Sequence, residues 1–327
     1  MEGLNITDTS FNGTAATYII TRAVIGSDTV DEGCLMIQDG IKYKHIIPRM
    51  TITLPFAIRQ ATPTSTATIT VDGNVIIPQN YMCYTEFNPR DLESYWTGYL
   101  LPERLIDAAL PQSFEGYMID TYLKQVNQGN EYMIWRGRTA YNPLNGGLDP
   151  TTKNCPATDA NYYYFDGLMV SLLNSTGTIQ VPTPVTITSA NVIATMNSVY
   201  SYIPVPVLRQ KNLRFHMSVN TWRLYSTALT SNTFKDNQTT EATTEAFKGF
   251  EIVVLGGMPD NTVIAAVSTE DKRSMFWLGL NSEADAQSPV IMKTTNASEL
   301  YFIKILLKAG VQFAFSEEIT VYTTVLQ

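Results

Sequence analysis

The sequence has little charge for its length. Charged residues make up 16% of its 327 residues, whereas about 25% is usual for soluble proteins. The 30 acidic and 22 basic residues give a net charge of −8. This charge excludes an overall positive surface potential that would bind nucleic acid. Neutral polar residues have to cover the surface instead. Such a composition is typical of a secreted all-β domain, or of a subunit with much of its surface inside an assembly.

Cysteine and histidine are equally scarce. The three cysteines, Cys34, Cys83 and Cys155, are widely spaced and odd in number, which argues against a disulfide framework and against a zinc site. The only histidines are His45, in the basic run KYKH, and His216, in a stretch that alternates like a strand. Neither has a carboxylate or cysteine partner in the sequence that would indicate catalysis. We therefore expect both to be structural or surface residues, and we predict neither a metal nor a cofactor.

Catalytic and targeting motifs are also missing. The sequence contains no nucleophile elbow, Walker loop, dinucleotide-binding glycine motif or zincin helix. Glu317 and Glu318 cannot flank one glycosidic bond, because neighbouring residues of a strand point to opposite faces. No leader segment occurs, and no apolar run approaches the ~20 residues of a membrane span. These absences predict a chain that is not an enzyme, originates in the cytosol and stays reduced.

A low-charge stretch, MTITLPFAIRQATPTSTATITVDG at 50–73, follows a polar N-terminal arm. Its two alternating runs are separated by the polar tip QATPTST, and Arg59 is the only charge between 50 and 71. Period two predicts two paired strands, whose apolar positions are Ile52, Leu54, Phe56, Ile58, Ala67, Ile69 and Val71. Two strands alone cannot bury an apolar face. This ribbon must therefore lie either on its own domain or on a neighbouring molecule.

Helical signals follow the ribbon. The segment 88–97 begins with a capping Asn-Pro pair, and a second helix is expected across 103–110. In 111–137 an apolar ridge recurs every four residues, at Phe114, Met118, Tyr122 and Val126. Gly129 costs about 1 kcal/mol inside a helix, so the pattern is weaker beyond it. If the helix continues, it is the longest of the chain.

The second half of the chain mixes helical and strand periods. We expect helices at 166–176, 189–204 and 219–229, and strands at 213–218, 247–267 and 273–280. Ser218 is placed to cap the helix that follows it, and Pro259-Asp260-Asn261 marks a turn inside 247–267. The sequence contains no internal repeat, and no linker cleanly separates domains.

The chain closes with YFIKILLKAGVQFAFSEEITVY, 301–322. Apolar residues occupy the odd positions from Tyr301 to Phe315 and resume at Ile319 and Val321, whereas several even positions are polar. Period two predicts strands with one buried face. The break at Ala309-Gly310 lies between two such runs, and it predicts a hairpin turn.

In order, these features resemble the major capsid proteins of tailed bacteriophages, which have the Hong Kong 97 type fold. The similar segments are the low-charge hairpin, the long helix, IWRGRT at 134–139, DGL at 166–168, and FKGFEIVVLGGMPDNTVIAA at 247–266. The resemblance implies an α+β capsid fold divided into an N-terminal arm with first strands (1–49), an extended E-loop (50–78), a peripheral domain containing a spine helix (79–180 and 281–327) and an axial domain (181–280). It also implies that the terminal strands complete the peripheral sheet, beneath a neighbour's ribbon.

The same resemblance implies a structural virion protein. Its partners would be copies of itself, in hexamers and pentamers that enclose double-stranded DNA without reading its sequence, together with a portal and with scaffold or decoration proteins. The protein would assemble in the host bacterial cytoplasm, reside in the virion capsid and contact no membrane. Intersubunit contacts would involve Ile52, Leu54, Phe56, Ile58, Arg59, Ile69 and Val71. Some relatives cross-link through an E-loop lysine, but 50–78 contains no Lys, so no such bond is expected here.

Two other functions are compatible with parts of the sequence. The aromatic run 162–165 could serve a virion-surface protein as a platform for carbohydrate or receptor, although packing is favoured because no Lys or Arg adjoins it. Helical periodicity at 111–128 and 189–204 argues against such a β-rich protein. An encapsulin-like compartment shell is a variant of the capsid hypothesis.

Overall fold

The structure is a computed structural model, and it describes residues 9–10, 27–53, 56, 58–59, 61–62, 67–88, 112–139, 162–231, 246–281, 290–294 and 300–324. Within these ranges the side chains of 9–10, 112–118 and 231 are not described. The helix expected at 103–110, and that expected at 88–97 apart from residue 88, lie outside the described residues.

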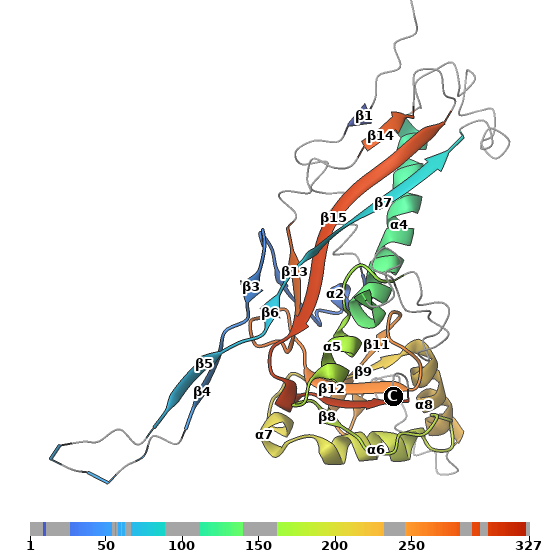
Figure 1. Cartoon of the computed structure of the whole chain (residues 1–327). Helices are drawn as coiled ribbons and strands as arrows, with labels where there is room; N and C mark the ends of the chain where they lie inside the picture. The colour runs from blue at the N-terminus through green and yellow to red at the C-terminus, as the bar shows by residue number, and fades with distance from the viewer. Residues whose placement is uncertain are drawn as a thin grey trace, which may run out of the picture.

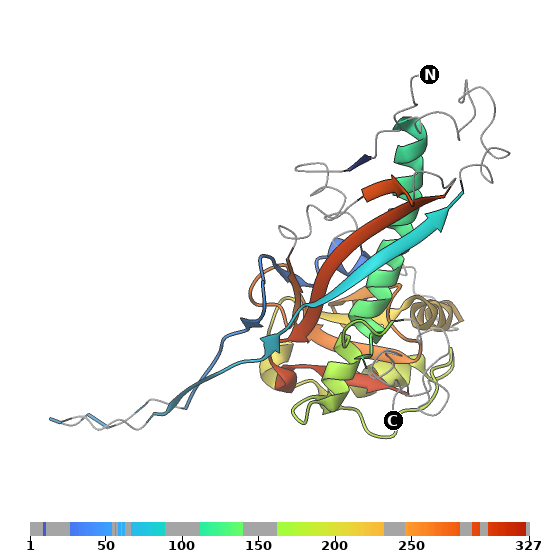
Figure 2. The ribbon, with the colours of Figure 1, turned by 45° about the horizontal axis from the view of Figure 1, so that its top comes forward.

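Two mixed sheets form two lobes, and a long two-stranded arm projects from their side (Figures 1 and 2). The first sheet has the order β1-β14-β15-β13-β2, with β7 on the other edge of β15. Its strands are β1 (Thr9–Ser10), β14 (Val290–Lys293), β15 (Tyr301–Phe313), β13 (Phe276–Leu280), β2 (Met36–Gln38) and β7 (Gln79–Phe87). The long helix α4, Gln112–Arg136, lies along this sheet (Figure 1).

Strand β15 is the central strand of the first lobe. Its odd positions from Tyr301 to Phe313 are all buried, as the period of two predicts. The expected turn at Ala309-Gly310 is wrong, because the strand runs through it without a break. Gly310 pairs with Gly279 of β13, and a Cβ on Gly310 would lie 3.1 Å from the Cα of Pro78. Glycine is needed here for a close approach of backbones and not for a turn.

The second lobe is built on the sheet β10-β11-β9-β12-β16-β8. Its strands are β10 (Ala246–Phe247), β11 (Phe250–Leu255), β9 (Leu213–Ser218), β12 (Thr262–Val267), β16 (Thr320–Thr323) and β8 (Ile179–Gln180). The strands on either side of the predicted turn, β11 and β12, both pair with β9 and not with each other. The last strand, β16, pairs with β12. The expectation that every terminal strand completes the first sheet is therefore wrong for β16, which follows the short 3-10 turn Ser316–Glu318 into the second lobe.

The predicted helices of the second half are present. They are α5 (Leu168–Asn174), α6 (Val192–Tyr202) and α8 (Val219–Ser231). Two short helices are also present, α7 (Val205–Leu208) between α6 and α8 and α2 (Asp28–Asp31) near the start of the chain. The backbone N–H of Thr221 donates to the hydroxyl of Ser218 at 3.2 Å, which confirms Ser218 as the cap of α8. Helix α4 continues past Gly129 and is the longest described helix.

Two glycines let the end of α4 meet the start of α5. The N–H of Gly167 donates to the carbonyl of Gly137 at 2.8 Å. A Cβ on Gly167 would lie 2.7 Å from the Met133 oxygen and 2.8 Å from the Gly137 nitrogen, both backbone atoms. The glycines of the segments IWRGRT and DGL are thus required by direct contact between two backbones.

His216 lies in the core between the lobes and has a structural role. It is fully buried on β9, with Nδ1 3.3 Å from the Ile264 oxygen and Nε2 2.9 Å from the Ser268 hydroxyl. The rings of Trp135 and Phe276 pack against it. The expectation that this histidine is structural is confirmed.

Adding a methyl group at Gly167 should destabilise the fold. Gly167→Ala forces backbone atoms apart, so the free energy of unfolding should fall by about 1–3 kcal/mol in urea denaturation. Gly129→Ala is the matched control, because a Cβ there meets nothing within 4 Å. That control should raise stability by up to about 1 kcal/mol. Equal effects of the two substitutions would contradict the close-contact explanation.

His216 should make the fold sensitive to acid. Burial lowers the pKa of His216 from 6.5 to about 4. Between these values the unfolded chain binds a proton that the folded chain does not, so the free energy of unfolding falls with falling pH, by at most about 1.4 kcal/mol per unit. Urea unfolding between pH 6.5 and 4 should show this slope, and His216→Gln should flatten it. An unchanged slope in the variant would rule out His216 as its source.

Candidate intersubunit surface

The arm consists of two short antiparallel ladders in series. Its base is formed by β3 (His45–Ile46) with β6 (Val75–Ile76), and its shaft by β4 (Arg49–Ile52) with β5 (Ile69–Asp72). In the shaft, Met50 pairs with Val71 and Ile52 with Ile69, whereas Thr51 pairs with Thr70 and Arg49 with Asp72. Since alternate residues share a face, the shaft has one apolar and one polar face. We call the first the apolar ribbon face: Met50, Ile52, Ile69 and Val71.

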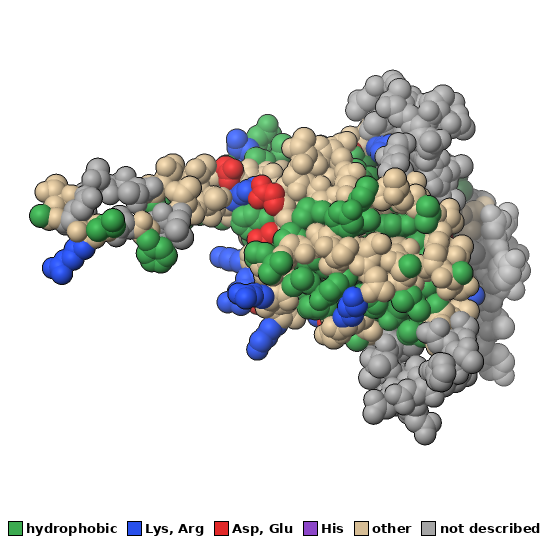
Figure 3. Space-filling model, turned by 90° about the horizontal axis from the view of Figure 1, so that it is seen from below, with side chains coloured by type: hydrophobic (Ala, Val, Ile, Leu, Met, Phe, Trp, Pro, Cys, Tyr) green, Lys and Arg blue, Asp and Glu red, His purple; other side chains and the backbone are tan. Residues whose placement is uncertain are grey.

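The apolar ribbon face is open to solvent. All four of its side chains are more than half exposed, with Val71 at 70%. Nearer the tip, Phe56 is 81% and Ile58 88% exposed, and Arg59 is also exposed. Figure 3 shows hydrophobic side chains along the projecting arm. Exposed apolar surface of this kind marks an interaction site.

The predicted contact residues are only partly brought together. Ile52, Ile69 and Val71 share one face in the observed pairing of β4 with β5, and Leu54 lies outside the described residues. Sequence reasoning missed Met50, although its even number continues the alternation of Ile52. Of the helix set, Val126 is buried and Tyr122 half-buried, while the side chains of Phe114 and Met118 are not described.

Arg49 anchors the shaft to the body. Its guanidinium donates two hydrogen bonds, of 2.9 and 2.7 Å, to the carboxylate of Glu317, and lies 3.7 Å from that of Asp72. It also lies over the ring of Phe315, 5.4 Å from the centroid. The bond to Glu317 raises the pKa of Arg49 further, so the ion pair persists at neutral pH. These contacts fix the direction in which the arm leaves the body.

The base of the arm is in close contact with the first sheet. A Cβ on Gly73 would lie 2.0 Å from the carbonyl oxygen of Ile47, so only glycine lets the two segments of the arm cross there. The side-chain amide of Asn74 donates to the carbonyls of Phe313 and Ala314, at 2.9 and 3.2 Å. The base is therefore part of the body, and only the shaft and tip stand free.

The body also exposes apolar side chains. On the face of β7 and β15 turned away from α4, Leu306 pairs with Met82 next to Tyr84, and these side chains are 40–54% exposed. On the underside of the second lobe, Val185, Tyr202 and Val205 are 43–68% exposed, and Figure 3 shows hydrophobic side chains gathered across that underside. The molecule thus carries an apolar arm and separate apolar strips on its body.

The described part of the chain offers little for other site types. Three or more His, Cys, Asp or Glu side chains nowhere gather there in a way suited to a metal, and none of the described helices combines the length and apolar character of a bilayer crossing. In the aromatic run 162–165, Tyr164 stacks on Tyr81 at 5.5 Å and Tyr162 packs on Tyr132 at 5.3 Å. The run packs against β7 and α4.

Comparison with known proteins identifies the fold. No protein-family model matches the sequence, and no curated protein matches it significantly. A chain of the satellite phage P4 procapsid is 10% identical, with a TM-score of 0.55, covering 93% of this chain and 97% of the other. The capsid protein of Myoviridae phage XM1 is 12% identical, with a TM-score of 0.51 and coverage of 99% and 96%. A capsid chain of the native GTA particle is 10% identical, with a TM-score of 0.52 and coverage of 92% and 89%.

The chain therefore has the fold of phage capsid proteins over almost its whole length, which confirms the predicted α+β capsid fold class. At this low identity the comparison establishes the fold, and the function has to be argued from the surface.

Removing the anchor should loosen the arm without unfolding the body. In Arg49→Ala, amide hydrogen exchange at 50–52 and 69–72 should become several-fold faster, because the shaft loses its link to Glu317. The global free energy of unfolding should change by less than about 1 kcal/mol, as for other partly exposed ion pairs. Arg59→Ala, at the exposed tip, should change neither. Unaltered exchange in Arg49→Ala would show that the anchor does not hold the shaft.

Proposed function

We propose that this protein is a major capsid protein, a non-enzymatic subunit that assembles with copies of itself into a closed shell. The observation that carries the proposal is the apolar ribbon face, a row of Met50, Ile52, Ile69 and Val71 on an arm that stands clear of its own body. Two strands in water are marginal without a surface to cover them. A second copy supplies that surface, and the phage capsid fold supports this assignment.

The strip on β7 and β15, formed by Met82, Tyr84 and Leu306, is the receiving surface that fits best. It is apolar and half-exposed, and it lies on the terminal strand that was expected beneath a neighbour's ribbon. Because arm and strip are different patches, each contact is heterologous and leaves a free arm and a free strip, so that the contacts continue around a ring. Burial of each Val- or Ile-sized side chain contributes about 1.5–3 kcal/mol.

The proposed assembly consists of hexamers and pentamers in an icosahedral shell around double-stranded DNA. Many weak contacts per subunit hold such a shell by multiplicity. The net charge of −8 suits an inner surface that encloses DNA without gripping it. The other proposed partners are a portal protein and scaffold or decoration proteins. We propose that the protein assembles in the cytoplasm of a bacterial host and that its final location is the virion capsid. The contact residues predicted from the sequence belong to this proposal as well, and so does the domain division, except that β13 joins the first sheet and β16 the second.

The alternatives receive less support. The tyrosines of a carbohydrate platform are engaged in packing against Tyr81 and Tyr132. For an encapsulin-like compartment shell, the arm would act in the same way, but the structures compared above are phage and GTA capsids.

Charge on the apolar ribbon face should prevent assembly. Val71→Asp places an ion where the proposed contact is dry, so shells or rings seen by electron microscopy of the wild-type protein, alone or with a scaffold protein, should be lost. Thr70→Asp is the matched control, one residue away on the polar face, and should still assemble. Both monomers should keep wild-type melting temperatures, because Val71 is already exposed. A wild-type protein that stays monomeric under all conditions, or a Val71→Asp variant that assembles normally, would contradict the proposal.

A further inference from the structure

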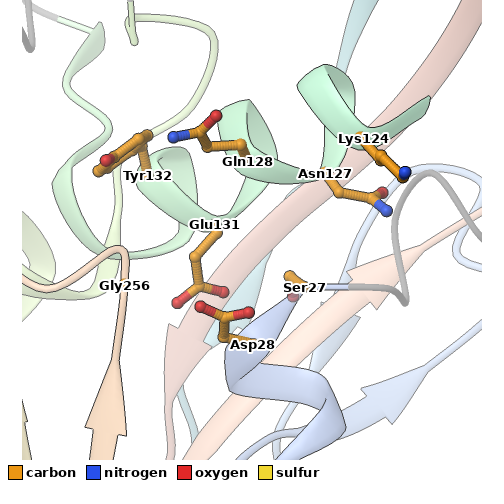
Figure 4. A pocket seen from close by; sticks show the side chains of 8 residues that line it. All are labelled: Ser27, Asp28, Lys124, Asn127, Gln128, Glu131, Tyr132 and Gly256. Carbon is orange, nitrogen blue, oxygen red and sulfur yellow. The ribbon is translucent and has the colours of Figure 1, made fainter. Parts of the chain in front are cut away.

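A pocket of about 340 Å³ lies between the first turn of α2 and the middle of α4. The connection after β11 closes it from a third side through Gly256. Figure 4 shows the carboxylates of Asp28 and Glu131 turned toward each other from α2 and α4. Gly256 lies close to Asp28, because a Cβ there would lie 2.8 Å from an Asp28 carboxylate oxygen. The pocket is therefore a junction of three segments with two acids at its centre.

The carboxylate of Glu131 accepts hydrogen bonds from two segments. Its carboxylate, only 4% exposed, accepts hydrogen bonds from the backbone N–H and hydroxyl of Thr29 and from the backbone N–H of Gly257 at 3.3 Å. These bonds suit an ionised carboxylate. The buried carboxylate of Glu131 therefore faces a second carboxylate, that of the exposed Asp28.

Two further oxygen atoms in the same pocket have no partner. Ser27 is only 2% exposed, and its hydroxyl forms no hydrogen bond within the described part of the chain. The side-chain oxygen of Asn127, on α4, is likewise buried and unpartnered there. Both residues line the pocket. Buried polar atoms without partners are costly, so both oxygen atoms need a partner such as water or a bound cation.

The pocket has only one basic residue in its lining, Lys124. Two carboxylates with neutral oxygen atoms are the ligand set of a hard divalent cation. We propose that Asp28, Glu131, Ser27 and Asn127 form a site for Ca²⁺ or Mg²⁺. The ion bridges α2 to α4 and offsets the repulsion of the two carboxylates.

The site goes beyond the proposed shell function and does not depend on it, since all of its ligands belong to one chain. With only two carboxylates, its affinity should be modest, with a Kd of about 10⁻⁴–10⁻³ M. Because the ion binds the folded chain and not the unfolded one, it stabilises the fold by mass action.

Terbium luminescence provides a local test. Tb³⁺ replaces Ca²⁺ at oxygen sites and is excited through a nearby indole, and the indole N–H of Trp135 donates to the Thr29 hydroxyl at 2.7 Å, next to the pocket. The full-length protein, stripped with EDTA, should show sensitised Tb³⁺ emission that Ca²⁺ competes away. Millimolar Ca²⁺ should also raise its melting temperature by a few degrees.

Asp28→Asn should weaken Tb³⁺ and Ca²⁺ binding at least about tenfold, as losses of metal-site groups commonly do. Asp31→Asn is the matched control, because Asp31 is an exposed acid on the same short helix outside the pocket. It should bind like the wild type. Ser27→Ala, which removes a single neutral ligand, should weaken binding several-fold and serves as the decisive variant if Asp28→Asn does not fold.

Absence of sensitised emission from the wild type at millimolar Tb³⁺ would overturn the site and would mean that the two acids share a proton instead. Emission that persists unchanged in Asp28→Asn, or in Ser27→Ala if the first variant fails to fold, would place the ion elsewhere and would overturn it equally. Shell formation by a protein that does not bind the ion would leave the proposed function intact.

Discussion

The structure depends on one constraint, which is that a two-stranded ribbon cannot bury its own apolar face. The two strands of the shaft pair with each other along their inner edges, but Met50, Ile52, Ile69 and Val71 remain in water. The body does not solve this problem, because among the described residues it contacts the arm at its base and at the first residue of the shaft, through Asn74, Arg49 and the buried Ile76. Direction is therefore set within the chain, while in the proposed shell the free energy of covering the arm comes from a second copy.

The body is organised to give that arm a rigid origin. The crossing at Gly73, the bonds from Asn74 to the end of β15, and the ion pair of Arg49 with Glu317 all converge where β15 passes into the 3-10 turn. Behind this point, α4 is fastened to the second lobe by Glu131, and by Arg136, which donates to the carbonyls of Gly257 and Met258. The two lobes and the arm are thus joined through a small number of polar contacts around a continuous apolar core.

Local patterns predicted the elements well and the long-range pairing poorly. Alternation identified the buried face of β15, and Ser218 was correctly assigned as a cap, because both signals act within a few residues. Gly310 was misinterpreted, since a glycine inside a strand has the same letter whether it turns the chain or admits a neighbouring backbone. The partner of β16 could not be predicted either, because sheet membership is decided by distant strands. Likewise, Ser27 and Glu131 lie more than a hundred residues apart in sequence, and nothing in either local segment indicates that they share a pocket.

The unbroken course of β15 has a mechanical consequence. Its thirteen residues are hydrogen-bonded along one edge to β13 and β14 and along the other to β7, and after the six residues 314–319 the chain enters the second lobe as β16. A pull on the arm reaches the end of this strand at Phe313, through Asn74, and the following turn at Glu317, through Arg49. It is then spread in shear over many backbone bonds that have to rupture together. Tension between the lobes would accordingly be carried by the covalent chain and its ladders, whereas side-chain contacts could slip and re-form under strain.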